Sequence, residues 1–291
     1  VNDATRASAD PYHPVRINAG NISLNSEGSL YLGDNALLNA NGGAWLNHKG
    51  KLKGGAGGNV TIMPGDFRSV TPSVIINGNA TSYSLTQGGK FTLGSAGFHI
   101  GDIAEVDNAT DRIQLSSGWF QQGGFSAFEL SAMNSGIDIA ENTNVMLQGS
   151  RYQMTDSRYL TTATGAAPDS LFTVVAANGL PDYVKPAVAL SLKSSQSGLP
   201  GAESHDGIRM GTGSLIQTLP GGNVNLYSEG GDIAIDGAVI ARGGNIALRV
   251  TPKSDISAFD PSLAIRLGES SVLDVSATVV DKPTVDGLIQ R

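Results

Sequence analysis

The chain has 291 residues and a formal net charge of −7; glycine accounts for 38 residues, and only 15% of residues are charged. This charge argues against a nucleic-acid partner, and the composition is unlike that of a helical or α/β enzyme domain. The sequence has no cysteine, which excludes disulfides and thiolate chemistry. It has no run of 18 apolar residues, so we expect no membrane insertion. We also expect no cofactor.

Residues 1–14 are polar, include two prolines and are predicted to form a loose lead-in. Short runs of alternating apolar residues follow, and this alternation is typical of strands with one buried face. The first runs contain Ile22 and Leu24, Leu30 and Leu32, and Leu37 and Asn39. A glycine- and lysine-rich insertion at 41–57 separates them from the next series, which opens at Gly58.

The middle of the chain is less regular. Further strands are expected at 74–76, 89–93, 98–100, 104–106 and 113–115, and then at 128–130, 137–139 and 145–147. The run SGWFQQGGF carries three aromatic residues and indicates an insertion at 116–126. Residues 148–187 show no sustained period, so we expect a protrusion there, with a hairpin near Leu171–Ala176.

Regular runs resume at Val188, continue through Ile208 and Leu215, and end near Val272. An insertion at 251–261 interrupts them, and residues 281–291 are predicted to be a tail. The clearest run is 220–251, where Gly222-Asn223-Val224 is matched 22 positions later by Gly244-Asn245-Ile246. A strand series that restarts at this interval is typical of a solenoid.

The sequence therefore predicts an all-β parallel solenoid with three short strands per coil over residues 15–280. A Gly-Asn-(Ile/Val)-x-(Leu/Ile) opening recurs at 20–24, 58–62, 222–226 and 244–248. Glycine suits a turn with positive φ, and a stacked asparagine can bond to its equivalents in neighbouring coils, so we predict a corner ladder of Asn21, Asn59, Asn223 and Asn245. The alternative is a β-sandwich built from ordinary hairpins.

Metal and phosphate chemistry have little support. The four histidines lie in unrelated contexts, and no phosphate-binding loop or nucleophile elbow is present. The acidic group Asp102, Glu105, Asp107 and Asp111 leaves two interpretations open, a calcium site or a solvated turn. We expect no metal and no catalytic residues, since the carboxylate pattern of polysaccharide hydrolases is missing.

Aromatic and arginine side chains in two of the insertions are the best candidates for ligand contact. They are Trp119, Phe120, Arg151, Tyr152, Arg158 and Tyr159. Aromatic faces stack on sugar rings, and the guanidinium group of arginine makes forked hydrogen bonds. The alternative is that Trp119 and Phe120 flank the core. A basic loop at 47–53 either contacts an anionic polymer or is simply solvated.

The Gly-Asn openings, the coils of about 20 residues and the segment from Trp119 to Ile139 together resemble filamentous-haemagglutinin-type exoproteins, which are bacterial adhesins exported by two-partner secretion. The resemblance covers residues 15–280 and implies a right-handed parallel β-helix at a Gram-negative cell surface. It also implies a host receptor or polysaccharide as ligand, and an outer-membrane transporter as the secretion partner.

The secretion-domain motif of that family is missing here, so we expect an internal or C-terminal segment acting as an adhesive rod. Two other functions stay open. The chain could be a polysaccharide-degrading β-helix, which would need a cleft with three carboxylates on one face, or it could be the stalk of a toxin-delivery exoprotein.

Overall fold

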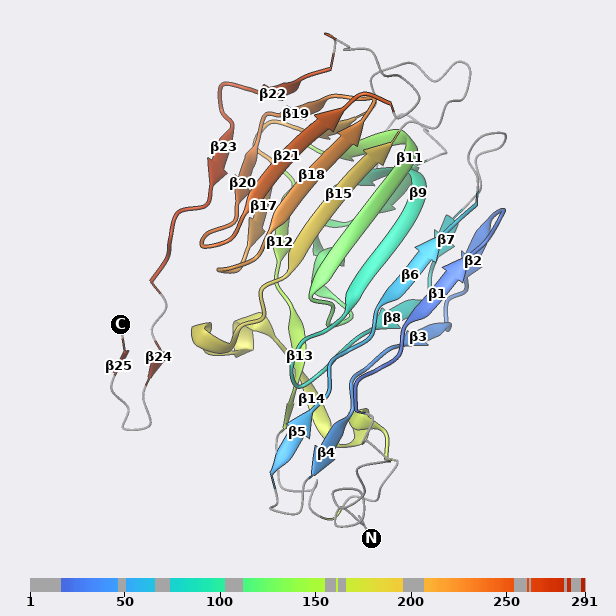
Figure 1. Cartoon of the computed structure of the whole chain (residues 1–291), viewed down its shortest axis with the longest axis vertical. Helices are drawn as coiled ribbons and strands as arrows, with labels where there is room; N and C mark the ends of the chain where they lie inside the picture. Colours follow the sequence, from blue (N-terminus) through green and yellow to red (C-terminus); the bar gives the residue numbers. More distant parts are fainter. Residues whose placement is uncertain are drawn as a thin grey trace.

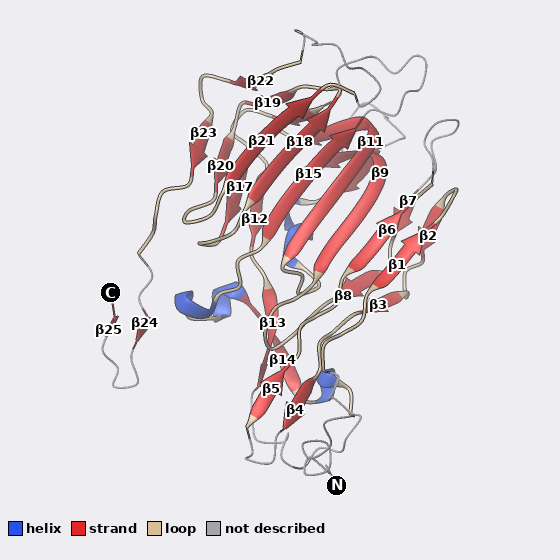
Figure 2. Cartoon of the chain, in the orientation of Figure 1, coloured by secondary structure: helices blue, strands red, loops and turns tan. Residues whose placement is uncertain are grey.

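A computed structural model of the chain contains β-strands and short 3₁₀ segments (Figures 1 and 2). The described residues are 17–46, 51–65, 74–102, 112–154, 161, 166–195, 207–253, 261, 263–279, 282–283 and 289–290. No helix in this part of the chain is long and apolar enough to span a membrane. The expectation of a mostly β fold with parallel sheets is confirmed.

The largest sheet contains seven parallel strands that pair in the order in which they occur in the sequence (Figure 1). They are β1 (Ile22–Asn25), β6 (Val60–Met63), β9 (Lys90–Ile100), β11 (Ala127–Ile139), β15 (Ala189–Ser195), β18 (Val224–Glu229) and β21 (Ile246–Thr251). We call the stretch from the start of one of these strands to the start of the next a unit, and number the units one to seven.

Shorter strands follow within the units, and in all but the third unit they pair with equivalent strands of a neighbouring unit. In the later units, β16 (Ile208–Met210), β19 (Ile233–Ile235) and β22 (Ile265–Leu267) pair in one parallel series. A second series contains β12 (Asn144–Leu147), β17 (Leu215–Thr218), β20 (Ala238–Ile240) and β23 (Val272–Asp274). The first two units have their own pairs, β2 (Leu30–Leu32) with β7 (Val74–Ile76), and β3 (Leu37–Asn39) with β8 (Asn79–Thr81).

β9 and β11 are longer because each belongs to two of these series. The first part of β11 pairs with β15, whereas Ile137–Ile139 pairs with β16. The chain bends between the two parts at Gly136, whose φ is 70°. Residues with a Cβ are disfavoured at positive φ, so glycine suits this bend.

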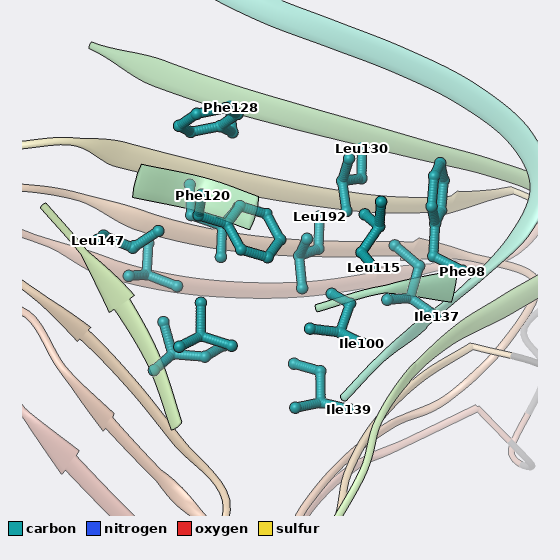
Figure 3. Packing of buried hydrophobic residues seen from close by; sticks show 14 of the residues in the cluster. Phe98, Ile100, Leu115, Phe120, Phe128, Leu130, Ile137, Ile139, Leu147 and Leu192 are labelled. Atoms are coloured by element: carbon teal, nitrogen blue, oxygen red, sulfur yellow. The ribbon is translucent and has the colours of Figure 1, made fainter. Parts of the chain in front are cut away.

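The core consists of apolar side chains stacked in register. One column holds Ile22, Val60, Phe91, Phe128, Leu190, Val224 and Ile246, and the next holds Leu24, Ile62, Leu93, Leu130, Leu192, Leu226 and Leu248. The central members of both columns are buried, and Figure 3 shows several of them packed together. This is the pattern that the alternation in the sequence predicts.

The predicted asparagine positions do stack at one corner, but the bonding differs from an amide-to-amide ladder. The side-chain oxygen of Asn21 accepts the backbone N–H of Asn59 at 2.9 Å, and that of Asn223 accepts the N–H of Asn245 at 3.0 Å. The oxygen of Asn59 accepts the N–H of Lys90 at 2.7 Å. An amide–amide contact is present only between Asn245 and Asn223 among the described asparagines, at 3.4 Å.

Antiparallel pairing among the named strands is confined to three hairpins, which argues against a sandwich of antiparallel sheets. They are β4 (Ala44–Leu46) with β5 (Leu52–Gly54), β13 (Ser150–Met154) with β14 (Phe172–Ala176), and β24 (Lys282–Pro283) with β25 (Ile289–Gln290). The first two lie in predicted insertions. The hairpin expected within 171–176 is corrected, because β14 pairs with β13 across a longer connection.

Candidate functional site

The regular pairing is interrupted between the second and third units. The large sheet continues there, although β6 and β9 are paired over only three residues. The two shorter series stop, because β7 and β8 are the last strands of two-stranded sheets. Figure 1 shows the separation between this first group of strands and the rest.

Two segments of the third unit explain the interruption. The strand β10 (Arg112–Leu115) folds back and pairs with β9 on the side opposite β11, instead of extending the series forward. The 3₁₀ segment η1 (Ser117–Gln121) then follows, so no described strand of this unit joins β8 or β12. A cavity of about 380 Å³ lies between β8 and η1.

Two glycines with positive φ determine the backbone conformation that follows η1. Gly123 and Gly124 have φ of 74° and 70°, and a Cβ on Gly124 would lie 2.2 Å from the ring of Tyr83. The carbonyl of Gly123 accepts the N–H of Ser82 at 2.6 Å, which ties the third unit to the second. The Gly-Gly pair in the SGWFQQGGF run is therefore required by a positive-φ turn that packs tightly against its neighbour.

Aromatic side chains form the inner wall of this cavity. Trp119 meets Phe91, Phe120 and Phe128 with ring centroids 5.2–5.3 Å apart. Phe125 meets Phe91 edge to face at 5.2 Å. Such tilted and edge-to-face arrangements are the favoured ones for aromatic rings. All of these rings except Phe120 line the cavity.

The polar groups of the cavity are uncharged. Asn79, Thr81 and Gln122 line it, and none of its lining residues in the described part of the chain is acidic or basic. The hydroxyl oxygen of Thr81 is buried and has no hydrogen-bond partner among the described residues. A buried hydroxyl without a partner is costly, and the hydroxyls of Ser214 and Ser228 in the later units share this state.

Two of the predicted ligand contacts are corrected by their burial. Phe120 has no exposed surface and lies in the core near Phe128 (Figure 3). Its ring meets those of Trp119 and Phe128 edge to face. Tyr152 is 1% exposed and stacks between Tyr83 and Phe172. Their aromatic surface is used in packing, which is the alternative that the sequence left open for Phe120.

Tyr152 anchors the hairpin β13–β14 to the second unit. Its backbone N–H donates to the carbonyl of Ser84 at 3.0 Å, and its hydroxyl donates to Asp169. Burial raises the pKa of the Tyr152 hydroxyl, and the Asp169 carboxylate raises it further. The neighbouring Arg151 donates to the carbonyl of Leu85, so part of its hydrogen-bonding capacity is used within the chain.

Several predicted features lie outside the described residues. They are Arg158 and Tyr159, the lead-in 1–14, His48 and Lys49, the strand at 104–106, and Glu105, Asp107 and Asp111. Of the acidic group, Asp102 accepts the hydroxyl of Ser117 at 2.7 Å and its N–H at 2.9 Å. These bonds lower the pKa of the Asp102 carboxyl. Among the described residues, no three acidic or histidine side chains gather as a metal site.

A second hollow, of about 310 Å³, lies along the series that contains β16 and β19. Three carboxylates line it, those of Asp138, Glu141 and Asp236, together with Arg209. Asp138 also pairs with the buried His99, whose Nδ1 is 3.0 Å away. Three acidic residues at one hollow are the feature that the enzyme alternative of the sequence analysis requires.

Comparison of the chain with protein-family models, with characterised proteins and with solved structures finds no match. Function must therefore be inferred from the geometry. Trp119 is the predicted ligand contact that lines the larger cavity, where Asn79 and Thr81 join it. These two polar residues were not predicted, although Asn77-Gly78 before them is a turn signal within the less regular stretch 63–90.

Proposed function

We propose that this chain is a structural and adhesive rod segment, built as a right-handed parallel β-helix with three strands per coil. The observation that carries the proposal is the set of seven in-register parallel strands, with stacked apolar columns inside. Crossover connections between parallel strands are almost always right-handed. Each coil of such a rod adds about 4.8 Å of length.

The asparagine corner supports the same architecture. Side-chain oxygens of Asn21, Asn59 and Asn223 each accept a backbone N–H from the following unit. Bonds of this kind hold neighbouring units in one register, so the stack behaves as a sum of nearest-neighbour interfaces. A rigid scaffold of this kind presents its interruptions as binding surfaces.

The biological setting follows from the resemblance to filamentous-haemagglutinin-type exoproteins. We place the segment outside the cell, at a bacterial surface, in cell–cell, host or biofilm-matrix attachment. Its parent protein would be exported through an outer-membrane transporter. The lack of cysteine suits export of an unfolded chain that needs no oxidative folding afterwards.

Staged unfolding tests the rod architecture. Under urea or mechanical load, units should be lost in steps, because each contacts mainly its neighbours. Hydrogen exchange at intermediate urea should show β18 and β21 protected while β1 and β6 exchange, or the reverse. A single sharp transition that includes all seven strands would count against a rod of separable units.

The carboxylate groove favours one second candidate, a polysaccharide-degrading enzyme. Asp138, Glu141 and Asp236 line one hollow, and glycoside hydrolysis uses carboxylates placed on either side of the scissile bond. Incubation with neutral and acidic polysaccharides should release no reducing ends or unsaturated products if the chain is a rod. Release that is abolished by Asp236→Asn would establish the enzyme instead.

A further inference from the structure

We propose that copies of this chain associate end to end, with the seventh unit of one copy stacked on the first unit of the next. Among the described strands, β21, β22 and β23 pair only with the sixth unit, and β1, β2 and β3 pair only with the second. β24 and β25 lie apart from the edge of the seventh unit (Figure 1). The proposal uses the stacked units of the rod and does not depend on its role in attachment.

Both end units expose apolar side chains that the stack buries elsewhere. Ile265 and Leu267 are 43% and 51% exposed, whereas their partners in β19 have no exposed surface. Leu273 is 39% exposed, and its partner in β20 is fully buried. In the first unit, Ile22 and Leu24 are half-buried, although their partners in β6 are fully buried. Each end therefore carries an apolar strand edge that a further unit would cover.

The two end units also share one local structure. Leu30–Asn39 reads LYLGDNALLN, and Ile265–Asp274 reads IRLGESSVLD. In both segments the two strands start seven residues apart, and the glycine carbonyl accepts the N–H three residues later, at 2.9 Å and 3.1 Å. β16 and β17 of the fifth unit have the same spacing and stack in register on the fourth unit. The two end faces can therefore stack in the register that the fourth and fifth units adopt.

The asparagine corner would fix this register between copies. Within the stack, the side-chain oxygen of Asn21 accepts the N–H of Asn59, and the N–H of Ile22 donates to the carbonyl of Asn59, both at 2.9 Å. The equivalent groups of the seventh unit are the side-chain oxygen of Asn245 and the N–H of Ile246. Among the described residues, no hydrogen bond reaches this oxygen of Asn245. These two groups would hold Asn21 of the next copy in the same way.

One pair of like charges opposes the contact and makes it testable. Asp34 and Glu269 each follow the glycine of their turn, so the register places Glu269 of one copy beside Asp34 of the next. Both residues are exposed. Two carboxylates in this position repel each other, and salt screens the repulsion. Association should therefore be stronger at high salt than at low salt.

Sedimentation velocity of the 291-residue chain over a range of concentrations tests the assembly. The average mass should rise beyond that of a dimer, because a head-to-tail contact leaves one free face of each kind at the two ends. Asn245→Ala removes the acceptor for the next copy and should weaken association about fivefold, the equivalent of one hydrogen bond. The backbone N–H of Asn245, which holds its own unit to the sixth, stays in this variant.

Charge reversal gives a signature that a change in net charge cannot imitate. Glu269→Lys and Asp34→Lys should each strengthen association about fivefold at low salt, because a lysine then faces a carboxylate. The double variant places lysine beside lysine and should return to about the wild-type affinity. Glu141→Lys is the matched control, since Glu141 is exposed at the equivalent turn position of the fourth unit, and it should leave association unchanged.

Three results would overturn the end-to-end contact: a chain that stays monomeric at every concentration and salt, a double charge variant that associates more tightly than either single variant, or unchanged association in Asn245→Ala. A particle that stops at a dimer would also overturn it. Staged unfolding of the same samples separates this result from failure of the rod. A monomer that unfolds in steps would leave the rod and remove the assembly, whereas assembly with a single sharp transition would do the opposite.

Discussion

Replacing Phe120 by alanine should destabilise the third and fourth units, between which its ring is packed, and leave the last units folded. The Phe120 ring has no exposed surface and contacts Trp119 at 5.2 Å and Phe128 at 5.6 Å between centroids. Removing a buried phenylalanine ring costs about 3–5 kcal/mol, of which each edge-to-face pair supplies roughly 0.5–1.5. The loss is centred on the third and fourth units, because Phe120 contacts Phe128 of β11 and η1 packs against β12.

The assay is urea unfolding followed by fluorescence and hydrogen exchange. Both tryptophans lie in the first half of the chain, so fluorescence reports that half, while amide exchange in β18 and β21 reports the other. Tyr31→Ala is the control, since that ring is 66% exposed and its loss should change stability by less than about 0.5 kcal/mol. A loss below about 1 kcal/mol for Phe120→Ala would refute the packing role of η1. Equal loss of protection in β18 and β21 would refute the independence of the units.

Three smaller changes test the corners and bends. Asn223→Ala should cost about 1 kcal/mol by urea unfolding because the N–H of Asn245 loses its acceptor, whereas Asn223→Asp keeps the acceptor and should cost less. Gly136→Ala should cost about 1–2 kcal/mol in the same measurement, since its φ is 70°. Hydrogen bonds from Ser276, and then from Arg242, lower the pKa of Asp274 to about 2. The stability that this carboxylate contributes should therefore be complete above pH 4 and disappear between pH 4 and 2; Asp274→Asn should remove that dependence, and unchanged pH dependence in the variant would contradict it.

Much of the strand framework could be predicted from the sequence, because a half-buried strand imposes a period of two on its residues. The openings at Gly20, Gly58, Gly222 and Gly244 each precede a strand of the largest sheet by two residues. Stacking in register follows from repeated openings, since equivalent strands bury equivalent positions. The positions of the stacked asparagines were predicted correctly, but their hydrogen-bond partners were not. Their side-chain oxygens accept backbone N–H groups of the next unit, because these lie closer than the next side-chain amide.

The site could not be predicted in the same way. Nothing in the pattern of β10 distinguishes a strand that extends a series from one that folds back beside β9, because both bury the same alternating face. Trp119 was predicted as a ligand contact and does line the cavity, but Phe120 next to it is directed into the core. Adjacent residues on a 3₁₀ turn face different directions, and only the tertiary packing decides which of them is covered.

The position of the cavity has a physical reason in the architecture itself. Where units stack in register, the inward side chains of the central units are covered by the units on either side, and a turn hydroxyl can find backbone partners. Ser82 illustrates this, since its hydroxyl donates to Gly58 at 2.8 Å and accepts from the N–H of Gly89 at 2.7 Å. The hydroxyl oxygen of Thr81, one residue earlier, is buried without a partner among the described residues, and no described strand of the third unit lies beside β8. A regular stack therefore leaves little to bind with, and recognition by this chain is expected where its regularity is broken.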